Sequence, residues 1–261
     1  MKHKHRTRAL ESRHDEARMV VGIHPVEALL RTRPDDLLSL LVSPLPHRPV
    51  LEKIVAAAQR QNVPVRMAPL RELDGLCGES RHQGVVAYAK PFTYTDFDAV
   101  CAQLRSQTQA LVLLLDSLQD PQNFGAIIRV AAAFAVDLIV IPKDRAVPVT
   151  MQVEKASAGM SMLVSIAQVT NLNRAMEKLK EAGFWLAGAT LEEATIVTKY
   201  EFTAKTGLVI GAEGAGLRHG TLQALDARVM IPMAQGIESL NASQATSILL
   251  YEIMRQREER K

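Results

Sequence analysis

Three polar loops of this chain each follow a short apolar run, and together they carry side chains that could bind a ligand. The loops are residues 116–125, 211–216 and 231–245, and they are rich in Gly, Asn, Asp, Glu and Ser. An apolar run that ends in such a loop is typical of a buried strand in a parallel sheet. Because the carboxyl ends of parallel strands meet at one edge of the sheet, we expect the three loops to build a single site.

Asn123, Arg129 and Glu213 are the first candidates for chemistry in or beside these loops. Asn123 precedes a helix predicted over Phe124–Phe134 and is expected to cap it, whereas Arg129 interrupts the apolar sequence of that helix. An arginine among apolar residues needs a structural carboxylate or a ligand phosphate as its partner. Glu213 lies within the glycine-rich sequence of residues 211–216, so its carboxylate is expected on a tight turn. Ordinary capping and turn roles remain the alternatives for these residues.

The third loop ends where another helix is predicted to begin, and Ser239, Asn241 and Ser243 cluster there. Such side chains cap helices and accompany backbone N–H groups that can bind a ligand. The chain has no GxSxG elbow, Walker A loop, HExxH sequence or Cys–His pairing, and the glycines of the second loop do not match the GxGxxG spacing. No histidine lies in the three loops. The sequence therefore favours a site that binds and orients a reactive cofactor.

Alternating strand and helix patterns position these loops and indicate an α/β fold with a parallel sheet covered on both faces. In the C-terminal part, the predicted strands are 111–115, 137–141, 164–169, 184–189, 208–210 and 227–231, and the predicted helices are 124–134, 152–160, 172–182, 217–225 and 242–257. In the N-terminal part, strands are predicted over 37–42, 63–68 and 84–89, and helices over 25–30, 50–61 and 70–76. We expect four segments: a basic disordered arm (1–18), a small α/β domain (19–91), a linker (92–106) and a larger domain (107–261).

The composition excludes several classes of protein. Cys77 and Cys101 are the only cysteines among 261 residues and have no CxxC partner, so neither disulfides nor a structural metal are expected. No apolar run approaches the roughly 20 residues of a membrane span, and the N-terminus lacks a signal-peptide core, so a cytoplasmic location is expected. Residues 1–18 alone carry a net charge of +3, which equals the net charge of the whole chain. Overall charge therefore does not indicate nucleic-acid binding, although the arginines of residues 19–90 suit phosphate.

Several ordered motifs resemble those of the SPOUT class of methyltransferases, and within it the ribose 2′-O-methyltransferases of ribosomal RNA. The motifs are residues 22–30 and 82–84 in the small domain, and residues 120–125 with Arg129, 169–172, 211–214, 231–233 and 239–241 in the large one. The resemblance covers almost everything after residue 18. It implies an L30e-like domain that binds RNA, a trefoil-knotted catalytic domain, S-adenosyl-L-methionine as cofactor, and a homodimer whose active site is completed across the interface.

The resemblance also implies an activity, which is 2′-O-methylation of a guanosine ribose in 23S ribosomal RNA. Carried over by position, the cofactor contacts are Gly211, Ile231, Leu240 and, with a weaker match, Thr190. The residues of the catalytic pocket are then Asn123, Arg129, Glu213, Ser239 and Asn241. Since a guanidinium stays protonated in proteins, we expect Arg129 to hold an RNA phosphate and to stabilise the developing alkoxide.

The chain departs from the family pattern at three positions. The usual Asn-Val-Ser-Val sequence is Asn241-Ala-Ser-Gln244 here, and a commonly acidic position is Met162. Two other functions stay open at this point: the same chemistry on transfer RNA, and RNA binding by a ribosome-assembly factor without catalysis. All polar motif positions are filled, which favours an enzyme.

Overall fold

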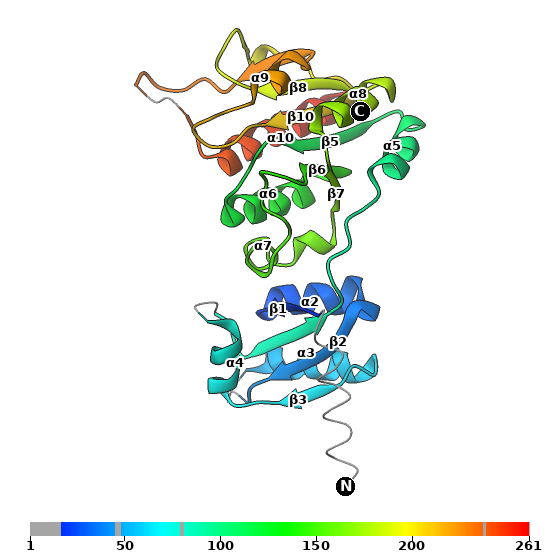
Figure 1. The fold of residues 1–261 in the computed structure, drawn as a ribbon, viewed down its shortest axis with the longest axis vertical. Coiled ribbons are helices and arrows are strands. Elements are labelled where there is room, and N and C mark those ends of the chain that lie inside the picture. The colour runs from blue at the N-terminus through cyan, green and yellow to red at the C-terminus, as the bar shows by residue number, and fades with distance from the viewer. Residues whose placement is uncertain (1–16, 45–47, 79–80, 237–238, 261) are drawn as a thin grey trace. The chain divides into compact units, whose positions relative to one another are not determined.

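The computed structural model describes residues 17–44, 48–78, 81–236 and 239–260, which form two compact units (Figure 1). Unit 1 runs to Thr93 and includes Val149–Leu163, and unit 2 comprises Tyr94–Pro148 and Val164 onward. The arm predicted over residues 1–18 lies outside the described residues except at its last two positions. Arg18 was wrongly assigned to that arm, because it begins a strand.

Unit 2 is built on a seven-stranded sheet in which all pairings are parallel, and this confirms the predicted α/β class. Its strands, in sheet order, are β7 (Ser165–Val169), β6 (Leu138–Pro142), β5 (Ala110–Leu115), β10 (Lys205–Ile210), β8 (Trp185–Ala189), β11 (Ala227–Met230) and β9 (Thr195–Ile196). The helices are α5 (Phe97–Arg105), α6 (Pro121–Ala133), α8 (Leu172–Glu181), α9 (His219–Gln223) and α10 (Ala242–Glu259), with a 3-10 turn η3 (Val197–Lys199). All residues of β5 are buried, as its apolar sequence predicts.

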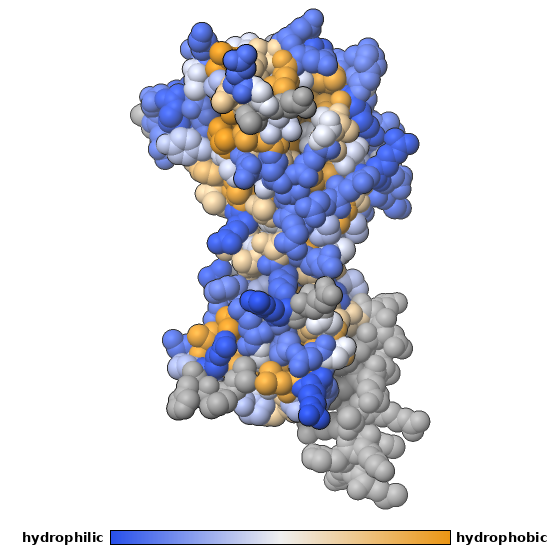
Figure 2. Space-filling model, turned by 90° about the vertical axis from the view of Figure 1, so that its left-hand side faces the viewer, coloured by the Kyte–Doolittle hydropathy of each residue, from blue (hydrophilic) through white to orange (hydrophobic). Residues whose placement is uncertain are grey.

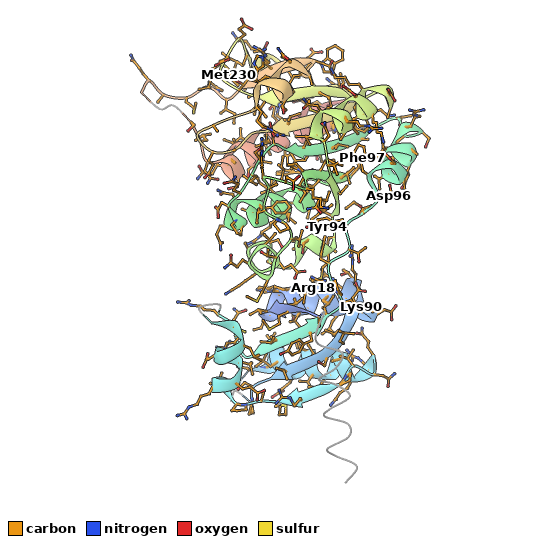
Figure 3. All side chains as sticks on the ribbon, in the orientation of Figure 1. Arg18, Lys90, Tyr94, Asp96, Phe97 and Met230 are labelled. Atoms are coloured by element: carbon orange, nitrogen blue, oxygen red, sulfur yellow. The ribbon has the colours of Figure 1, made fainter. Side chains whose placement is uncertain are left out.

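The sequence allows a short helix in the predicted linker, and the structure has one there, whereas one edge strand of unit 2 was not predicted. Helix α5 occupies most of the predicted linker and is capped by Asp96, whose side chain accepts a hydrogen bond from the Ala99 backbone nitrogen at 3.0 Å (labelled in Figure 3). Strand β9 has two residues at the sheet edge, too few to produce an alternating pattern.

Unit 1 contains a mixed four-stranded sheet with the order β1-β4-β2-β3, in which β4 is antiparallel to both of its neighbours and β2 is parallel to β3. The strands are β1 (Arg18–Val21), β2 (Leu37–Val42), β3 (Val65–Met67) and β4 (Val85–Ala89). The helices are α2 (Ile23–Thr32), α3 (Pro49–Arg60), α4 (Leu70–Cys77) and α7 (Met151–Ala156), with the 3-10 turns η1 (Pro34–Asp36) and η2 (Met160–Met162). Leu29, Leu40 and Ile54 lie in its core.

The segment Val149–Leu163 leaves unit 2 after β6 and packs within unit 1, although its sequence was assigned to the larger domain. Helix α7 packs against β1, and η2 packs against α2. Gly159 allows this approach, because a Cβ there would lie 2.7 Å from the Cβ of Ala28. The chain thus passes between the two units three times.

A buried ion pair ties this segment to the first strand. Glu154 on α7 is 1% exposed, and its carboxylate pairs with Arg18. The Arg18 Nε also donates to the backbone oxygen of Lys90 at 2.8 Å (Figure 3). Burial lowers the pKa of the Arg18 guanidinium to about 10. Since an isolated buried carboxylate is costly, this pair fixes the position of α7 on β1.

The strands β5, β10, β8 and β11 are neighbours in the sheet of unit 2, so the loops after them open at one edge. These loops include the three predicted from the sequence. No helix in the described part of the chain is long and apolar enough to cross a membrane.

Candidate functional site

Three of the predicted catalytic residues, from three different loops, are joined by hydrogen bonds. The Asn123 Nδ2 donates to Glu213 Oε1 at 2.8 Å, and the Asn241 Nδ2 donates to the same oxygen at 2.5 Å and to Asn123 Oδ1 at 2.8 Å. The backbone nitrogen of Ala242 donates to Glu213 Oε1 at 3.3 Å. One carboxylate oxygen is therefore held by three donors. The expectation that distant loops converge on one site is met for these residues.

Asn123 is not the cap of α6, contrary to the sequence-based expectation. Asp120 caps this helix, with side-chain oxygens that accept from the backbone nitrogens of Gln122 at 3.1 Å and Asn123 at 3.2 Å. Pro121 follows at the first helical position, where a missing N–H costs nothing. Asn123 therefore lies inside the first turn, and its amide is free to bond Glu213.

Glu213 stands on a tight turn, as predicted. Ala212 and Gly216 exchange backbone hydrogen bonds of 3.1 and 2.9 Å across it. Gly214 has a φ of 73°, a left-handed conformation that glycine adopts without strain. A Cβ on Gly211 would lie 2.2 Å from the carbonyl carbon of Gly216, so only glycine fits where the turn closes.

Asn241 caps α10, as the cluster of polar residues at this helix start predicts. Its Oδ1 accepts from the backbone nitrogen of Ser243 at 2.9 Å and from the Ser243 hydroxyl at 2.6 Å. The cap fixes the amide, so its Nδ2 can point only toward Asn123 and Glu213. The start of α10 thus orients the Asn241 amide as well as stabilising the helix.

A pocket of about 350 Å³ opens beside Glu213, at the carboxyl ends of β8, β10 and β11. The labelled Met230 in Figure 3 marks the end of β11. All four predicted cofactor contacts line the pocket, and so do Glu213 and Ser239. Most of the other lining residues are apolar or glycine; the lining includes Thr190, Gly211, Ile231 and Leu240 together with Ile210, Leu217, Leu222, Val229, Met233 and Leu249. Its size and largely apolar walls are typical of a small-molecule site.

Arg129 lies apart from this cluster. It is exposed on α6, does not line the pocket, and makes no hydrogen bond or ion pair with other described residues. Of the two partners expected for this arginine, the described residues supply no carboxylate, and the ligand phosphate stays a prediction. Residues Asn123, Ile127 and Ile128 are buried, whereas residue 129 falls on the solvent side of the same helix.

Sequence reasoning missed a second carboxylate that organises the loops. Asp116, fully buried at the end of β5, accepts from the backbone nitrogen of Arg218 at 3.0 Å and from its Nε at 2.6 Å. Arg218 follows the turn that carries Glu213, so this pair joins the first two loops. The signal was available, since an Asp directly after an apolar strand requires a partner.

The Asn123–Glu213–Asn241 cluster can accept a hydrogen bond from a bound hydroxyl and so orient it next to a largely apolar pocket. The three donors occupy Glu213 Oε1, so Oε2 is the oxygen that can accept from a bound hydroxyl. Within the described residues, no group of three His, Cys, Asp or Glu side chains could hold a metal ion. A carboxylate held by two amides and a backbone N–H can orient a hydroxyl of a bound substrate.

Family comparison agrees with this arrangement. Residues 110–251 match the model of the SpoU rRNA Methylase family, and residues 19–95 match the model described as RNA 2′-O ribose methyltransferase substrate binding. The chain belongs to the SpoU rRNA methylase family. Its members are RNA methyltransferases, so the chain is an enzyme of that class.

Relatives of this SpoU chain extend over almost its whole length. A 23S rRNA (guanosine-2′-O-)-methyltransferase, RlmB, from Coxiella burnetii is 38% identical over 240 residues, which are 92% of this chain and 96% of the relative. A relative from Staphylococcus saprophyticus, named for the TrmH family of tRNA/rRNA methyltransferases, is 37% identical over 241 residues, again 92% of this chain and 96% of the relative.

A solved SpoU structure has the same fold. The methyltransferase AviRb from Streptomyces viridochromogenes, in complex with AdoMet, has a TM-score of 0.77 at 24% identity and covers 97% of this chain, which covers 93% of it. At this identity the likeness establishes the fold alone.

Proposed function

We propose that this chain transfers the methyl group of S-adenosylmethionine to the ribose 2′-hydroxyl of a guanosine in 23S ribosomal RNA. The observation that carries the proposal is the Asn123–Glu213–Asn241 cluster beside an apolar pocket. The name of the Coxiella relative supports the guanosine and 23S assignment. A non-catalytic assembly factor would not need to retain this hydrogen-bonded cluster.

The pocket fits the cofactor. Its volume of about 350 Å³ and its apolar side chains suit an adenine and ribose, and Gly211, which has no side chain, leaves room for the turn that closes beside it. Gly211, Ile231, Leu240 and Thr190 would hold S-adenosylmethionine here. When bound, it supplies an electrophilic sulfonium methyl group.

The chain's own residues orient the nucleophile. Asn123, Asn241 and the Ala242 backbone hold Glu213, whose Oε2 then accepts a hydrogen bond from the ribose 2′-hydroxyl and orients it. Ser239 lines the same pocket and can hold the hydroxyl from its other side. Arg129 would bind the adjacent RNA phosphate and stabilise negative charge on the attacking oxygen.

Unit 1 would bind the RNA, in keeping with the description of the family model that matches residues 19–95.

Mapping of ribose methylation in total RNA from a strain that lacks this chain tests the proposal. We expect one guanosine in 23S rRNA to lose its methyl group, with recovery when the gene is restored. Loss confined to transfer RNA would reject the 23S substrate and favour transfer RNA.

Replacing Gly211 by alanine should weaken cofactor binding, because the added Cβ would lie 2.2 Å from the Gly216 backbone and open the turn. We expect the affinity for S-adenosylmethionine, measured by isothermal titration, to fall at least about tenfold while the circular dichroism spectrum stays native. Gly75→Ala is the matched control, since nothing lies within 4 Å of a Cβ there. Unchanged affinity in Gly211→Ala would show that the cofactor binds elsewhere.

We further propose a homodimer formed through α6 and α10, which pack side by side. Ile248 and Tyr251 on α10 are 40% and 60% exposed, and they share one helical face with the exposed Gln244. The Tyr251 ring packs edge-on against Phe134, with centroids 6.4 Å apart. Because Arg129 projects from α6 without a partner in the described chain, it would complete the site of the second subunit.

This arrangement predicts complementation between inactive variants. Arg129→Ala and Glu213→Ala subunits should each be inactive alone, and co-expressed subunits should regain methyl transfer, because a mixed dimer contains one intact site. The measurement is methyl incorporation by co-purified, differently tagged subunits. A mixed dimer as inactive as its parents would place Arg129 and Glu213 in the same subunit's site. Ile248→Asp should disrupt the dimer interface, and the molar mass measured by light scattering should then be that of a monomer.

The proposal extends to the knot, to the fold of unit 1 and to the location of the protein in the cell. The loops after β10 and β11 would form the trefoil knot of the SPOUT class around the cofactor pocket, and unit 1 would have the L30e-like fold. A cytoplasmic location would follow from the proposed substrate, because bacterial ribosomal RNA is found there.

A further inference from the structure

A second cavity, of about 410 Å³, lies in unit 2 and has a polar lining. It is formed by residues after β6, residues after β7 and the start of α9. Arg145 and Arg218 supply its positive charges, Asp144 is the one carboxylate, and Thr170, Asn171 and Asn173 add neutral polar groups. Since β6 and β7 belong to the same parallel sheet as β5 and β10, this cavity opens at the edge that carries the Glu213 site.

Arg218 is oriented for a ligand by a buried anchor. Its backbone nitrogen and Nε both bond Asp116, at 3.0 and 2.6 Å, and the Asp116 side chain is fully buried. These two bonds do not use the terminal Nη1 and Nη2 groups, and the Arg218 side chain is 42% exposed. A guanidinium fixed in this way presents its other donors without losing side-chain entropy on binding.

Arg145 contributes a cation with no competing partner. It stands on the loop after β6 with a φ of 62°, is exposed, and makes no hydrogen bond or ion pair with the residues that the structure describes. Planar guanidinium groups bind phosphate oxygens through paired hydrogen bonds. A cavity lined by two arginines and by neutral polar groups therefore matches an anion better than an uncharged ligand.

We propose that this cavity binds a phosphodiester group of the substrate RNA, on a nucleotide that flanks the methylated ribose. The inference rests on the proposed function, because the ligand is the backbone of the RNA to be methylated. Arg218 lies five positions after Glu213 in the chain, so a phosphate held there is close to the turn that carries the reacting group. Asp144 is expected to weaken the binding of phosphate, since its carboxylate repels the anion that the two arginines attract.

The test uses two substitutions with opposite expected effects in the full-length enzyme. Arg145→Gln should raise the KM for RNA about tenfold, as expected for loss of a charge-assisted hydrogen bond. It should also lower the salt dependence of RNA binding by about one phosphate contact. Asp144→Asn should lower the KM. For both variants, kcat at saturating RNA and the Kd for S-adenosylmethionine should stay at their wild-type values.

Arg105→Gln is the matched control, because Arg105 is an exposed arginine at the end of α5, before β5, and so at the opposite edge of the sheet. Inorganic phosphate should compete with RNA no better than chloride at equal ionic strength, which separates a phosphodiester from a free anion. An unchanged KM and salt slope in Arg145→Gln, equal effects in Arg105→Gln, or strong competition by phosphate would overturn the proposal. A wild-type enzyme that binds RNA without methylating it would instead reject the proposed function, and the salt dependence of RNA binding by Arg145→Gln would then test RNA binding by the cavity alone.

Discussion

Replacing Glu213 by alanine is expected to reduce methyl transfer to RNA by at least about a hundredfold. The carboxylate receives hydrogen bonds from Asn123, Asn241 and the Ala242 backbone, so its loss removes the acceptor for the ribose hydroxyl and leaves three donors without their partner. The measurement is the single-turnover rate with saturating RNA and cofactor, which separates chemistry from binding.

Two further measurements show whether a lower rate in Glu213→Ala reflects the loss of this carboxylate from the reaction. The Kd for S-adenosylmethionine should change little in Glu213→Ala, because most of the pocket walls are apolar side chains. Glu201→Ala is the matched control, since Glu201 is an exposed carboxylate of unit 2 that lines neither cavity. A single-turnover rate in Glu213→Ala within about threefold of wild type would exclude this carboxylate from the reaction, because loss of one such electrostatic contact costs far more.

The second large effect is on stability and concerns the buried ion pair of unit 1. Arg18→Met should lower the free energy of unfolding by about 3–5 kcal/mol, because the Glu154 carboxylate, 1% exposed, would be left without its partner. Urea denaturation followed by circular dichroism measures the change. The double variant Arg18→Met/Glu154→Met should recover most of the loss, since two apolar side chains can replace a buried pair.

An exposed ion pair provides the comparison. Lys178 and Asp98 are bonded at 2.5 Å but are 37% and 67% exposed, so Lys178→Met should cost less than about 1 kcal/mol. If Arg18→Met were equally mild, the Arg18–Glu154 pair would not be what holds α7 against β1.

The fold of unit 2 could be predicted from its sequence because its strands are almost wholly apolar. Strand β5 is predicted within one residue, and β10 is longer than predicted because the sequence Lys205-Thr-Gly207 at its start is not apolar. The packing of Val149–Leu163 in unit 1 could not be predicted, because local patterns do not reveal which core a helix joins. The burial of Glu154, which makes the segment need a distant cation, becomes known only from the structure.

The candidate site could be predicted in outline but not in its local roles. Asn123, Glu213 and Asn241 converge because their loops follow β5, β10 and β11, which lie within four consecutive strands of one parallel sheet. The capping role went to Asp120 instead of Asn123 because the proline after Asp120 sets the first helical residue. The apolar neighbours of Arg129 predict either a structural carboxylate or a ligand phosphate as its partner, and helical periodicity, which places it on the solvent side, leaves only the second. Strand adjacency thus predicts which loops meet, whereas side-chain roles depend on the helix register.

The central claim is tested most directly by incubating the purified protein with S-adenosylmethionine and a 23S rRNA transcript, digesting the RNA and analysing its nucleosides. We predict one new product, guanosine with a methyl group on the ribose 2′-oxygen, absent when Glu213→Ala replaces the wild type. A methyl group on a base, or a transcript unmodified by a protein that binds the cofactor, would contradict the account.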